Sequence, residues 1–306
     1  MRFILGFIGS VFAAILLFSM ISNLATYIGN KPAPLASDVF HKEPKELHLA
    51  SDGPFGSFKN QAQLQRGFQI YSEVCSACHS LKLVSFRDLK GIGYNEAEIK
   101  KIASDWKTQV PSINPDTGEA STRKALPSDN FPSPFANEVA ARAANNNALP
   151  PDLSLMPKAR EGGASYIYSI LTGYQNQPAG LLKQFPDAKT PPNLHYNPYF
   201  ANLNIAMPPP LKGGEVTFAD GSPNDLQHEA QDVAALLVWA SEPTLPNRHA
   251  AGLAVAVFLL VAAVLAYLAY QQIWHDAKRE VRLTGALEPK NQAKVKRAKA
   301  KQGVAG

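Results

Sequence analysis

The sequence predicts a mainly α-helical protein in which one polar domain with long proline-rich loops lies between two apolar helices. Uncharged apolar runs occupy both ends of the 306-residue chain, and nearly all of its 24 prolines lie between them. Apolar residues in this middle region recur at helical rather than strand spacing. We therefore divide the chain into a hydrophobic anchor or signal segment (1–30), an exported domain (31–249), a transmembrane helix (250–273) and a basic tail (274–306).

The N-terminal segment is hydrophobic and longer than a typical export signal. No charged residue occurs from Phe3 to Ile28, whereas the apolar stretch of a secretory signal has about 7 to 15 residues and precedes a small-x-small cleavage site. Only weak cleavage candidates follow, around Leu24 and Ala25. We favour a retained anchor over a cleaved signal, and either one exports the domain that follows.

The exported domain begins with an extended approach over 31–58, a stretch rich in proline, glycine and charge. The first helix is expected over 61–74, because Leu64, Phe68 and Tyr71 recur at helical spacing.

The only two cysteines of the chain follow this helix directly, in the run Cys75-Ser76-Ala77-Cys78-His79. A C-x-x-C-H run is typical of covalent haem attachment. Cysteines three positions apart on a helical turn lie on nearly the same face, so both sulfurs can reach the two vinyl groups of one porphyrin. His79 can then place a ring nitrogen on the iron. The expected cofactor is one covalently attached haem c.

Two other interpretations of this run are weaker. A structural zinc site needs four ligands, and Cys75, Cys78 and His79 supply three without a second cysteine pair to complete them. A thioredoxin-type pair would lie near a strand-helix-strand pattern, whereas the preceding segment has helical spacing.

Four more helices are expected in the domain. Asn95 is a suitable N-cap for the first of them, Pro111 closes that region, Gly173 is placed to end another, and Pro243 stops the last. A short hairpin is expected at 214–218, before the turn residues that follow. The expected helices cover 96–106, 137–145, 163–172 and 226–241.

The connections between these helices are long and dense in proline, at 127–134, 149–151, 186–192 and 207–210. Such loops are uncommon in compact domains, but a haem is a large flat apolar body around which a chain can wrap. The predicted fold is therefore a c-type cytochrome haem domain with long loops wrapped around haem.

The iron's second axial ligand is expected to be a methionine, a histidine or an open site. Met1 and Met20 lie in the N-terminal segment, which leaves Met156 and Met207. Both precede a proline, so the local sequence does not separate them, although the stiff loop Ala206–Pro210 favours Met207. Each remaining histidine is more typical of a surface residue than of a ligand.

The second apolar run, 250–270, has the length of a membrane-spanning helix, with Tyr267 and Trp274 as interface anchors. The tail from Gln271 carries nine basic and three acidic residues. By the positive-inside rule the tail is cytoplasmic and the haem domain lies on the opposite, periplasmic face of a bacterial inner membrane.

The net charge of +5 comes from the tail rather than the exported domain. Without Arg2 and the basic tail residues the chain keeps 20 lysines and arginines, and without the tail acids it keeps 22 aspartates and glutamates. The tail suits lipid headgroups rather than nucleic acid. A slightly acidic haem domain suits a basic mobile partner.

The sequence resembles the cytochrome c1 family, the haem-bearing membrane subunit of the quinol:cytochrome c oxidoreductase (cytochrome bc1) complex. The resemblance covers most of residues 50–275. The long N-terminal apolar segment is not a family requirement, and no cysteines remain for the disulfide of some bacterial members. The motifs that carry the resemblance are VCSACHSL (74–81), AARAANN (140–146), ALPPDLS (148–154), LTGY (171–174), NPYF (197–200) and IAMP (205–208).

This resemblance implies roles for further residues. It implies Met207 as the sixth ligand and places Met156 where an apolar side chain packs on the haem. It implies that Arg160 and Tyr166 hold a haem propionate, in keeping with the bidentate geometry of arginine with a carboxylate. The residues implied to line the crevice are Asn145, Pro150, Pro151 and Phe200.

The resemblance also implies partners and a role in electron transport. The electron donor would be a Rieske iron-sulfur protein, the acceptor a soluble or tethered cytochrome c, and the membrane neighbour cytochrome b, within a dimeric complex. The chain itself would transfer electrons without catalysing a bond-making reaction. Three rivals are a membrane-anchored peroxidase, which needs an open sixth site and a distal acid-base residue, a mono-haem cytochrome serving another enzyme, and a haem-free scaffold.

Overall fold

The computed structural model describes residues 2–29, 33–284, 292–294 and 296–297. The chain divides into two compact units, Met1–Ser51 with Phe58–Pro243 and Asp52–Ser57 with Thr244–Gly306. Most of the predicted basic tail, including Lys290, Lys299 and Lys301, lies outside the described residues. Met1 and Asn30, at the two ends of the predicted anchor segment, also lie outside them.

A long apolar helix is present near each end of the chain, as the predicted fold class requires. Helix α1 (Arg2–Gly29) contains a candidate membrane span at Phe3–Gly29, and helix α10 (Leu245–Thr284) contains one at Leu245–His275. Their mean hydropathies are 2.5 and 2.7, and their side chains are not buried by the protein. Two such helices indicate membrane association.

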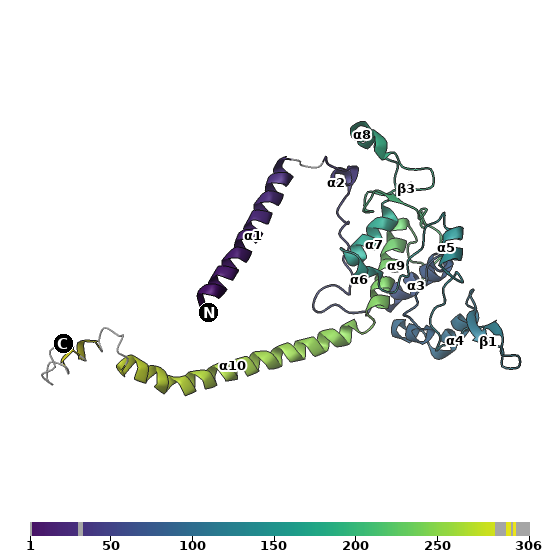
Figure 1. The fold of residues 1–306 in the computed structure, drawn as a ribbon. Coiled ribbons are helices and arrows are strands. Elements are labelled where there is room, and N and C mark those ends of the chain that lie inside the picture. The colour runs from purple at the N-terminus through teal and green to yellow at the C-terminus, as the bar shows by residue number, and fades with distance from the viewer. Residues whose placement is uncertain (1, 30–32, 285–291, 295, 298–306) are drawn as a thin grey trace. The chain divides into compact units, whose positions relative to one another are not determined.

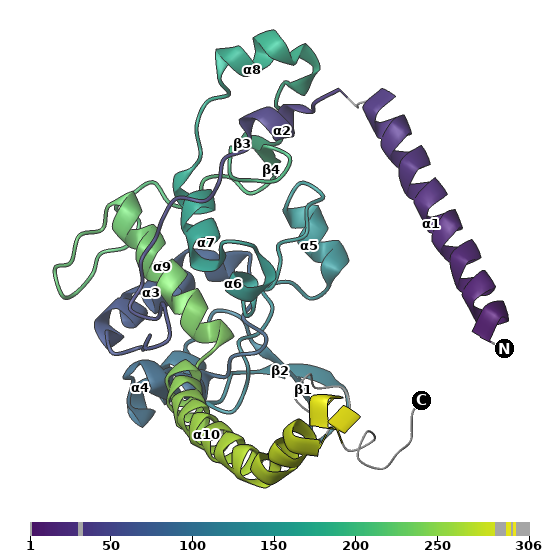
Figure 2. The ribbon, with the colours of Figure 1, turned by 90° about the vertical axis from the view of Figure 1, so that its left-hand side faces the viewer.

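The domain between them is mainly helical, as predicted (Figures 1 and 2). Helix α3 (Gln61–Glu73) packs against α9 (Leu226–Ser241), and α9 also packs against α7 (Gly163–Thr172). Helices α7 and α9 coincide with their predicted ranges. The other helical elements are α2 (Ala36–Phe40), η1 (Cys75–Ala77), η2 (Phe86–Ile92), α4 (Glu96–Ser104), α5 (Glu138–Ala144), α6 (Met156–Ala159), α8 (Ala179–Gln184) and η3 (Pro186–Ala188).

The predicted N-cap Asn95 is present, but Gly173 has a different role from the one expected. The Asn95 side chain accepts hydrogen bonds from the amides of Ala97 and Glu98 at 2.9 and 3.0 Å. Gly173 has a φ of −99°, so it ends α7 without the left-handed conformation that favours glycine. It is needed for space, because a Cβ atom there would lie 2.4 Å from the Tyr199 ring.

The strands lie where the sequence did not predict them. The segment 214–218 is an irregular loop rather than the expected hairpin, since its Glu215 carboxylate bonds the amides of Lys212 and Gly213 at 2.8 Å. An antiparallel hairpin forms instead from β1 (Val110–Ile113) and β2 (Ala120–Arg123), and β3 (His195–Tyr196) pairs with β4 (Asn204–Ile205).

The main core is rich in aromatic rings and surrounds α3. Phe86 and Phe131 have ring centroids 4.2 Å apart, and Trp106 lies 4.9 Å from Phe131. Phe68 and Tyr71 bring the α3 face into the same cluster. Tyr71, Phe86 and Phe131 are among the largest fully buried side chains of the described residues, so this cluster helps to fix the position of α3.

Helices α3 and α9 approach each other so closely that only glycine fits at position 67. A Cβ atom on Gly67 would lie 2.2 Å from the backbone oxygen of Asp232 and 2.9 Å from the Cβ atom of Leu236. No real Cβ atom tolerates the first of these distances, so a side chain at position 67 would force the two helices apart.

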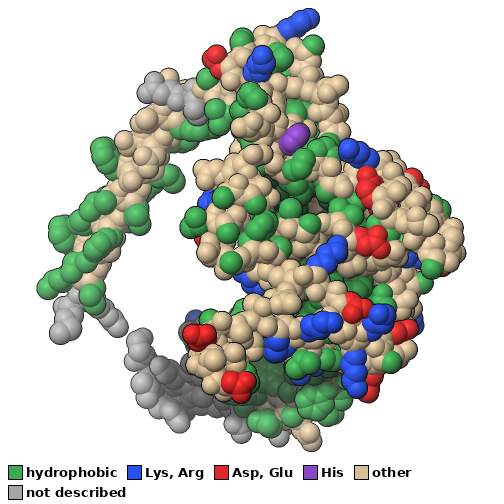
Figure 3. All heavy atoms as spheres, turned by 90° about the vertical axis from the view of Figure 1, so that its right-hand side faces the viewer, with side chains coloured by type: hydrophobic (Ala, Val, Ile, Leu, Met, Phe, Trp, Pro, Cys, Tyr) green, Lys and Arg blue, Asp and Glu red, His purple; other side chains and the backbone are tan. Residues whose placement is uncertain are grey.

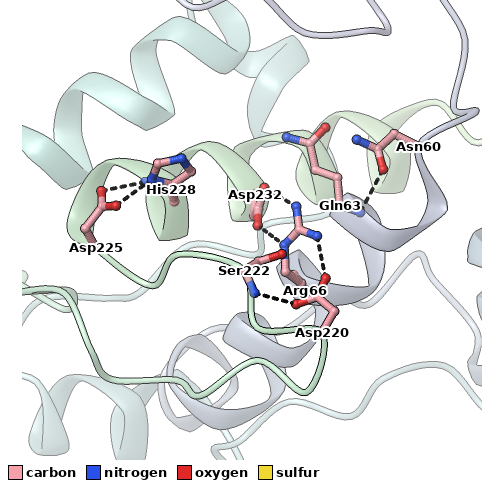
Figure 4. Close-up of polar contacts among 8 residues, drawn as sticks. All are labelled: Asn60, Gln63, Arg66, Asp220, Ser222, Asp225, His228 and Asp232. Carbon is pink, nitrogen blue, oxygen red and sulfur yellow. Dashed lines mark hydrogen bonds and ion pairs between the residues drawn. The ribbon is translucent and has the colours of Figure 1, made fainter.

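An arginine beside this contact joins three segments (Figure 4). Arg66 Nε donates to Asp232 Oδ2 at 2.6 Å, and its Nη1 donates to Asp220 Oδ2 at 2.9 Å. The Asp232 side chain is only 5% exposed. Removing Arg66 would leave Asp232 buried without its charge partner, which is destabilising.

Gly67→Ala should lower the free energy of unfolding by about 2 kcal/mol or more, because α3 and α9 must separate to admit the methyl group. Gly180→Ala on α8 is the matched control, since no heavy atom lies within 4 Å of the added Cβ. Urea denaturation of the full chain in detergent, followed by circular dichroism, measures both. Equal midpoints for the two variants would contradict the close-packing explanation.

Glu229 is an acid on α9 that is buried between this helix and the loop that contains Val216. It is fully buried, its Oε1 accepts the Val216 amide at 3.2 Å, and its Oε2 has no hydrogen-bond partner among the described residues. Burial, and then the nearby Glu215 carboxylate, raise the pKa of Glu229 to about 7. The folded protein therefore favours the protonated acid at this position.

The raised pKa predicts that Glu229 costs stability as pH rises from about 4.5 to about 7, because the folded state holds a proton that the unfolded state releases. Glu229→Gln should therefore raise the denaturation midpoint at pH 8 and leave it unchanged near pH 4, where the acid is protonated in both states. Denaturation midpoints of the two proteins across this pH range provide the test. A gain that is the same at pH 4 and pH 8 would refute the ionisation argument.

Candidate functional site

The C-x-x-C-H run forms a tight turn at the end of α3. The helix ends at Val74, and the amides of Cys78 and His79 both donate to the carbonyl of Cys75, at 3.1 and 2.9 Å. Both cysteines are free thiols and partly buried. Cys75 contacts two hydrophobic clusters of the domain. Burial raises the pKa of the Cys75 thiol to about 12, so it stays protonated at neutral pH.

The imidazole of His79 has a defined orientation. Its Nδ1 lies 2.8 Å from the carbonyl oxygen of Pro151. A carbonyl oxygen only accepts, so Nδ1 carries the proton and Nε2 holds the free lone pair that a metal needs. Burial lowers the pKa of His79, although the Pro151 hydrogen bond and the Asp152 charge act in the opposite direction. The ring is therefore held neutral, which is the form that ligates iron.

Two side chains hold the backbone around His79 and Pro151 in place. Tyr71 on α3 donates its hydroxyl to the backbone carbonyl of His79 at 3.1 Å. Asp152 accepts from the Ser80 hydroxyl and the Lys82 amide, both at 2.8 Å. These bonds fix the Asp152 backbone, and with it the preceding Pro151 carbonyl, relative to the turn that carries His79.

Met207 lies in the proline-rich loop that follows β4 and is half-buried. The Tyr174 hydroxyl donates to its backbone carbonyl at 3.0 Å. Tyr174 follows α7, and Leu171 near the end of α7 packs against the same two clusters as Cys75. Helix α7 therefore connects the Met207 loop to the C-x-x-C-H turn. Met156, in contrast, begins α6 and packs against the main core.

The loop that contains Phe200 is held by a buried asparagine. Asn197 is fully buried, its Nδ2 donates to the Ile170 carbonyl at 2.8 Å, and its Oδ1 accepts the Tyr199 amide at 3.1 Å. Phe200 itself is half-buried in the turn that follows. The absence of a side chain at Gly173 gives this loop its space, which explains why the LTGY and NPYF motifs go together.

The other predicted residues lie on the partly exposed surface near these loops. Tyr166 on α7 is half-buried and packs against the main core. Asn145 caps the end of α5 and donates to the Ala141 carbonyl at 2.7 Å. Pro150 is half-buried. Arg160 follows α6 and is exposed, with one hydrogen bond to the Ala159 carbonyl and no ion pair in the described part of the chain.

The side of the domain that bears α5 and the β1–β2 hairpin displays hydrophobic side chains among charged ones (Figure 3). On α5, Val139 is 78% exposed, and Leu149 in the next loop is 37% exposed.

A separate hollow of about 540 Å³ lies beside the Met207 loop, lined in part by Tyr174, His195 and Pro209. None of the residues predicted to bind haem lines it. Its polar walls distinguish it from the apolar surroundings of Cys75.

Several residues that hold the site together were not predicted from the sequence. Tyr71, Asp152, Tyr174 and Asn197 act through hydrogen bonds to distant backbone atoms. Lys45 of the N-terminal arm also belongs here, since its amide donates to the Ser169 hydroxyl at 2.7 Å. Tyr174 and Asn197 belong to the LTGY and NPYF motifs, but these motifs do not indicate which backbone atoms the two side chains bond.

The donor set at this site fits a haem c. It combines two thiols on one turn, an imidazole with a free Nε2, and a loop methionine whose backbone is fixed by Tyr174. No group of three or more His, Cys, Asp and Glu side chains among the described residues could hold a bare metal ion. Thiols, an imidazole and a thioether are the donor groups through which proteins hold a haem.

Comparisons with known proteins agree with the geometry. A model of the Cytochrome C1 family matches residues 49–277. The chain is 43% identical over 240 residues to cytochrome c1 of Rhodospirillum rubrum, which covers 74% of this chain and 85% of that protein. It is 41% identical over 231 residues to an Arabidopsis thaliana protein named cytochrome c1 1, heme protein, mitochondrial, covering 76% of this chain and 72% of that one.

A third relative is a longer protein that this chain matches over part of its length. The cytochrome b/c1 protein of Bradyrhizobium diazoefficiens is 38% identical over 274 residues, which cover 85% of this chain and 39% of that longer protein. With a family match across three quarters of its length, this chain belongs to the cytochrome c1 family, the haem-bearing electron carriers of the cytochrome bc1 complex.

Proposed function

We propose that this chain binds one haem c covalently through Cys75 and Cys78, with His79 and Met207 as axial ligands, and carries single electrons within the cytochrome bc1 complex. The orientation of His79 is the main support, because its Nδ1 is committed to the Pro151 carbonyl and its Nε2 is free. In the attachment step each thiol adds across a vinyl double bond, so a carbon–sulfur bond forms and the thiol proton moves to the vinyl group. No oxidant is required.

The proposed axial pair would raise the reduction potential of the haem iron. Bound haem supplies an iron that gains and loses one electron. His79 would hold this iron through its imidazole, and the soft, neutral thioether of Met207 would stabilise the reduced iron and so raise its potential. We propose a Rieske iron-sulfur protein as donor, and a Rieske potential can reach about +300 mV. A carrier that accepts electrons from such a donor needs a high reduction potential, which a histidine and methionine ligand pair provides.

The proposed propionate contact rests on Arg160 and Tyr166. Arg160 is exposed and forms no ion pair within the described residues, so its planar guanidinium is available to donate two hydrogen bonds to a carboxylate. Tyr166 lies on α7, the helix that also leads to the Met207 loop. Asn145, Pro150, Pro151 and Phe200 are proposed to line the crevice, and all four are at least partly accessible.

The proposed setting is a bacterial inner membrane with the haem domain on the periplasmic side and the basic tail in the cytoplasm. The unequal distribution of basic residues supports this orientation. The α10 span would pack beside cytochrome b in a dimeric complex, and a basic cytochrome c would accept the electron from the slightly acidic domain. Quinol oxidation would belong to partner subunits, so the chain itself would transfer electrons without catalysing a bond-making reaction.

Covalent attachment can be tested by mass. The full chain, purified from its membrane and denatured, should carry the mass and the visible spectrum of one haem. Replacing both thiols in a Cys75→Ser, Cys78→Ser double variant should remove both signals after denaturation, whereas Ser76→Ala should keep them. A chain that runs free of pigment when unfolded would overturn the proposal.

The sixth ligand can be tested by potentiometry. Met207→Leu should keep the haem attached but lower its potential by on the order of 0.1 V, because axial ligands set haem potentials over a range of roughly 0.8 V. Met156→Leu is the matched control, since Met156 packs against the protein core. If Met156→Leu lowers the potential and Met207→Leu does not, the ligand role belongs to Met156.

A further inference from the structure

A short turn ahead of α3 presents a phenylalanine to solvent at its tip. The Gly56 amide donates to the Gly53 carbonyl at 3.2 Å, which makes Pro54 and Phe55 the central residues of a β-turn. Gly53 has a φ of +74°, a left-handed conformation that glycine adopts easily. The Phe55 side chain is 80% exposed. The turn is therefore a defined structure that displays an aromatic ring.

This turn is attached to the first residues of the apolar helix α10. His249 Nδ1 donates to the Gly56 carbonyl at 3.2 Å. Leu245, one helical turn earlier on the same face, is only 5% exposed. The segment Asp52–Ser57 belongs to the same compact unit as α10. The height of the turn relative to the membrane is thus set by α10.

The attachment point coincides with the start of the uncharged stretch. Arg248 and His249 are followed by no charged residue or histidine until His275. About 20 residues of helix cross the hydrocarbon core, so the 25 residues from 250 to 274 reach both interfaces. A turn bonded to His249 therefore lies at the headgroup level on the side where α10 begins.

The composition of the turn suits lipid better than a protein partner. Residues 53–58 carry no charge. Aromatic rings are enriched at the membrane interface, where an apolar ring meets polar headgroups. A protein interface needs on the order of 1,000 Å² of buried surface, and a single projecting phenylalanine does not supply it.

We propose that the Gly53–Gly56 turn is an interfacial membrane anchor, in which Phe55 inserts between the lipid headgroups beside the first turn of α10. This inference rests on α10 spanning the membrane, which is part of the proposed function. It adds a second point of attachment at the same interface. Two points held together by the His249 bond would restrain rotation of the helix end.

Spin labelling tests where the Phe55 position lies. A nitroxide is attached through Phe55→Cys in the full complex, reconstituted into phosphatidylcholine and phosphatidylglycerol vesicles. Its accessibility to oxygen, which concentrates in lipid, is compared with its accessibility to a nickel chelate, which stays in water. Leu260→Cys in the middle of α10 serves as the lipid reference, and Ile113→Cys on strand β1, 69% exposed, as the water reference.

The label at position 55 should be several-fold more accessible to oxygen relative to the nickel chelate than the label at position 113, approaching the label at 260. A ratio equal to that at 113 would place Phe55 in water and overturn the anchor. Exclusion of both probes would assign Phe55 to a protein contact and also overturn it. If the label at 260 is itself open to the nickel chelate, the membrane span is wrong rather than the anchor alone.

Discussion

The contact between α3 and α9 at Gly67 is the constraint on which the haem domain depends. Helix α3 ends directly at the C-x-x-C-H turn, so the position of α3 sets the position of both thiols and of His79. The backbone of α9 lies so close to Gly67 that the two helices have little freedom to shift. Arg66 ties the same contact to Asp220 and Asp232, and the aromatic cluster packs against α3 through Phe68 and Tyr71. A turn fixed in this way holds its ligands in one geometry.

The loops around the site are long, but buried side chains hold them in place. Asn197 fixes the loop that contains Phe200, Tyr174 fixes the backbone of Met207, and Asp152 fixes the carbonyl that orients His79. Each uses a side chain to satisfy backbone groups that no helix or strand satisfies, which is the requirement for an irregular segment away from water. An electron carrier gains from such rigidity, because its ligands need not move when the iron changes charge.

Much of the fold was predictable from the sequence, and the unpredicted elements share a cause. The helices of α3, α7 and α9 follow from apolar spacing, and Asn95 and Asn137 mark helix starts by their capping chemistry. The β1–β2 hairpin was missed although a proline and a glycine stand in its turn, at Pro115 and Gly118. The hairpin predicted at 214–218 was wrong, because the Glu215 carboxylate accepts hydrogen bonds from nearby backbone amides, and such bonds compete with strand pairing.

The sequence by itself determined the chemistry of this protein, and the tertiary structure decided how that chemistry is held. The cysteine spacing and the following histidine indicate a cofactor locally, because the two thiols and the imidazole lie within five residues. The tautomer of His79, the attachment of the Met207 loop and the need for glycine at position 67 depend on Pro151, Tyr174 and Asp232. These partners lie 33 to 165 positions away, and local sequence patterns carry no information about contacts made at such separations.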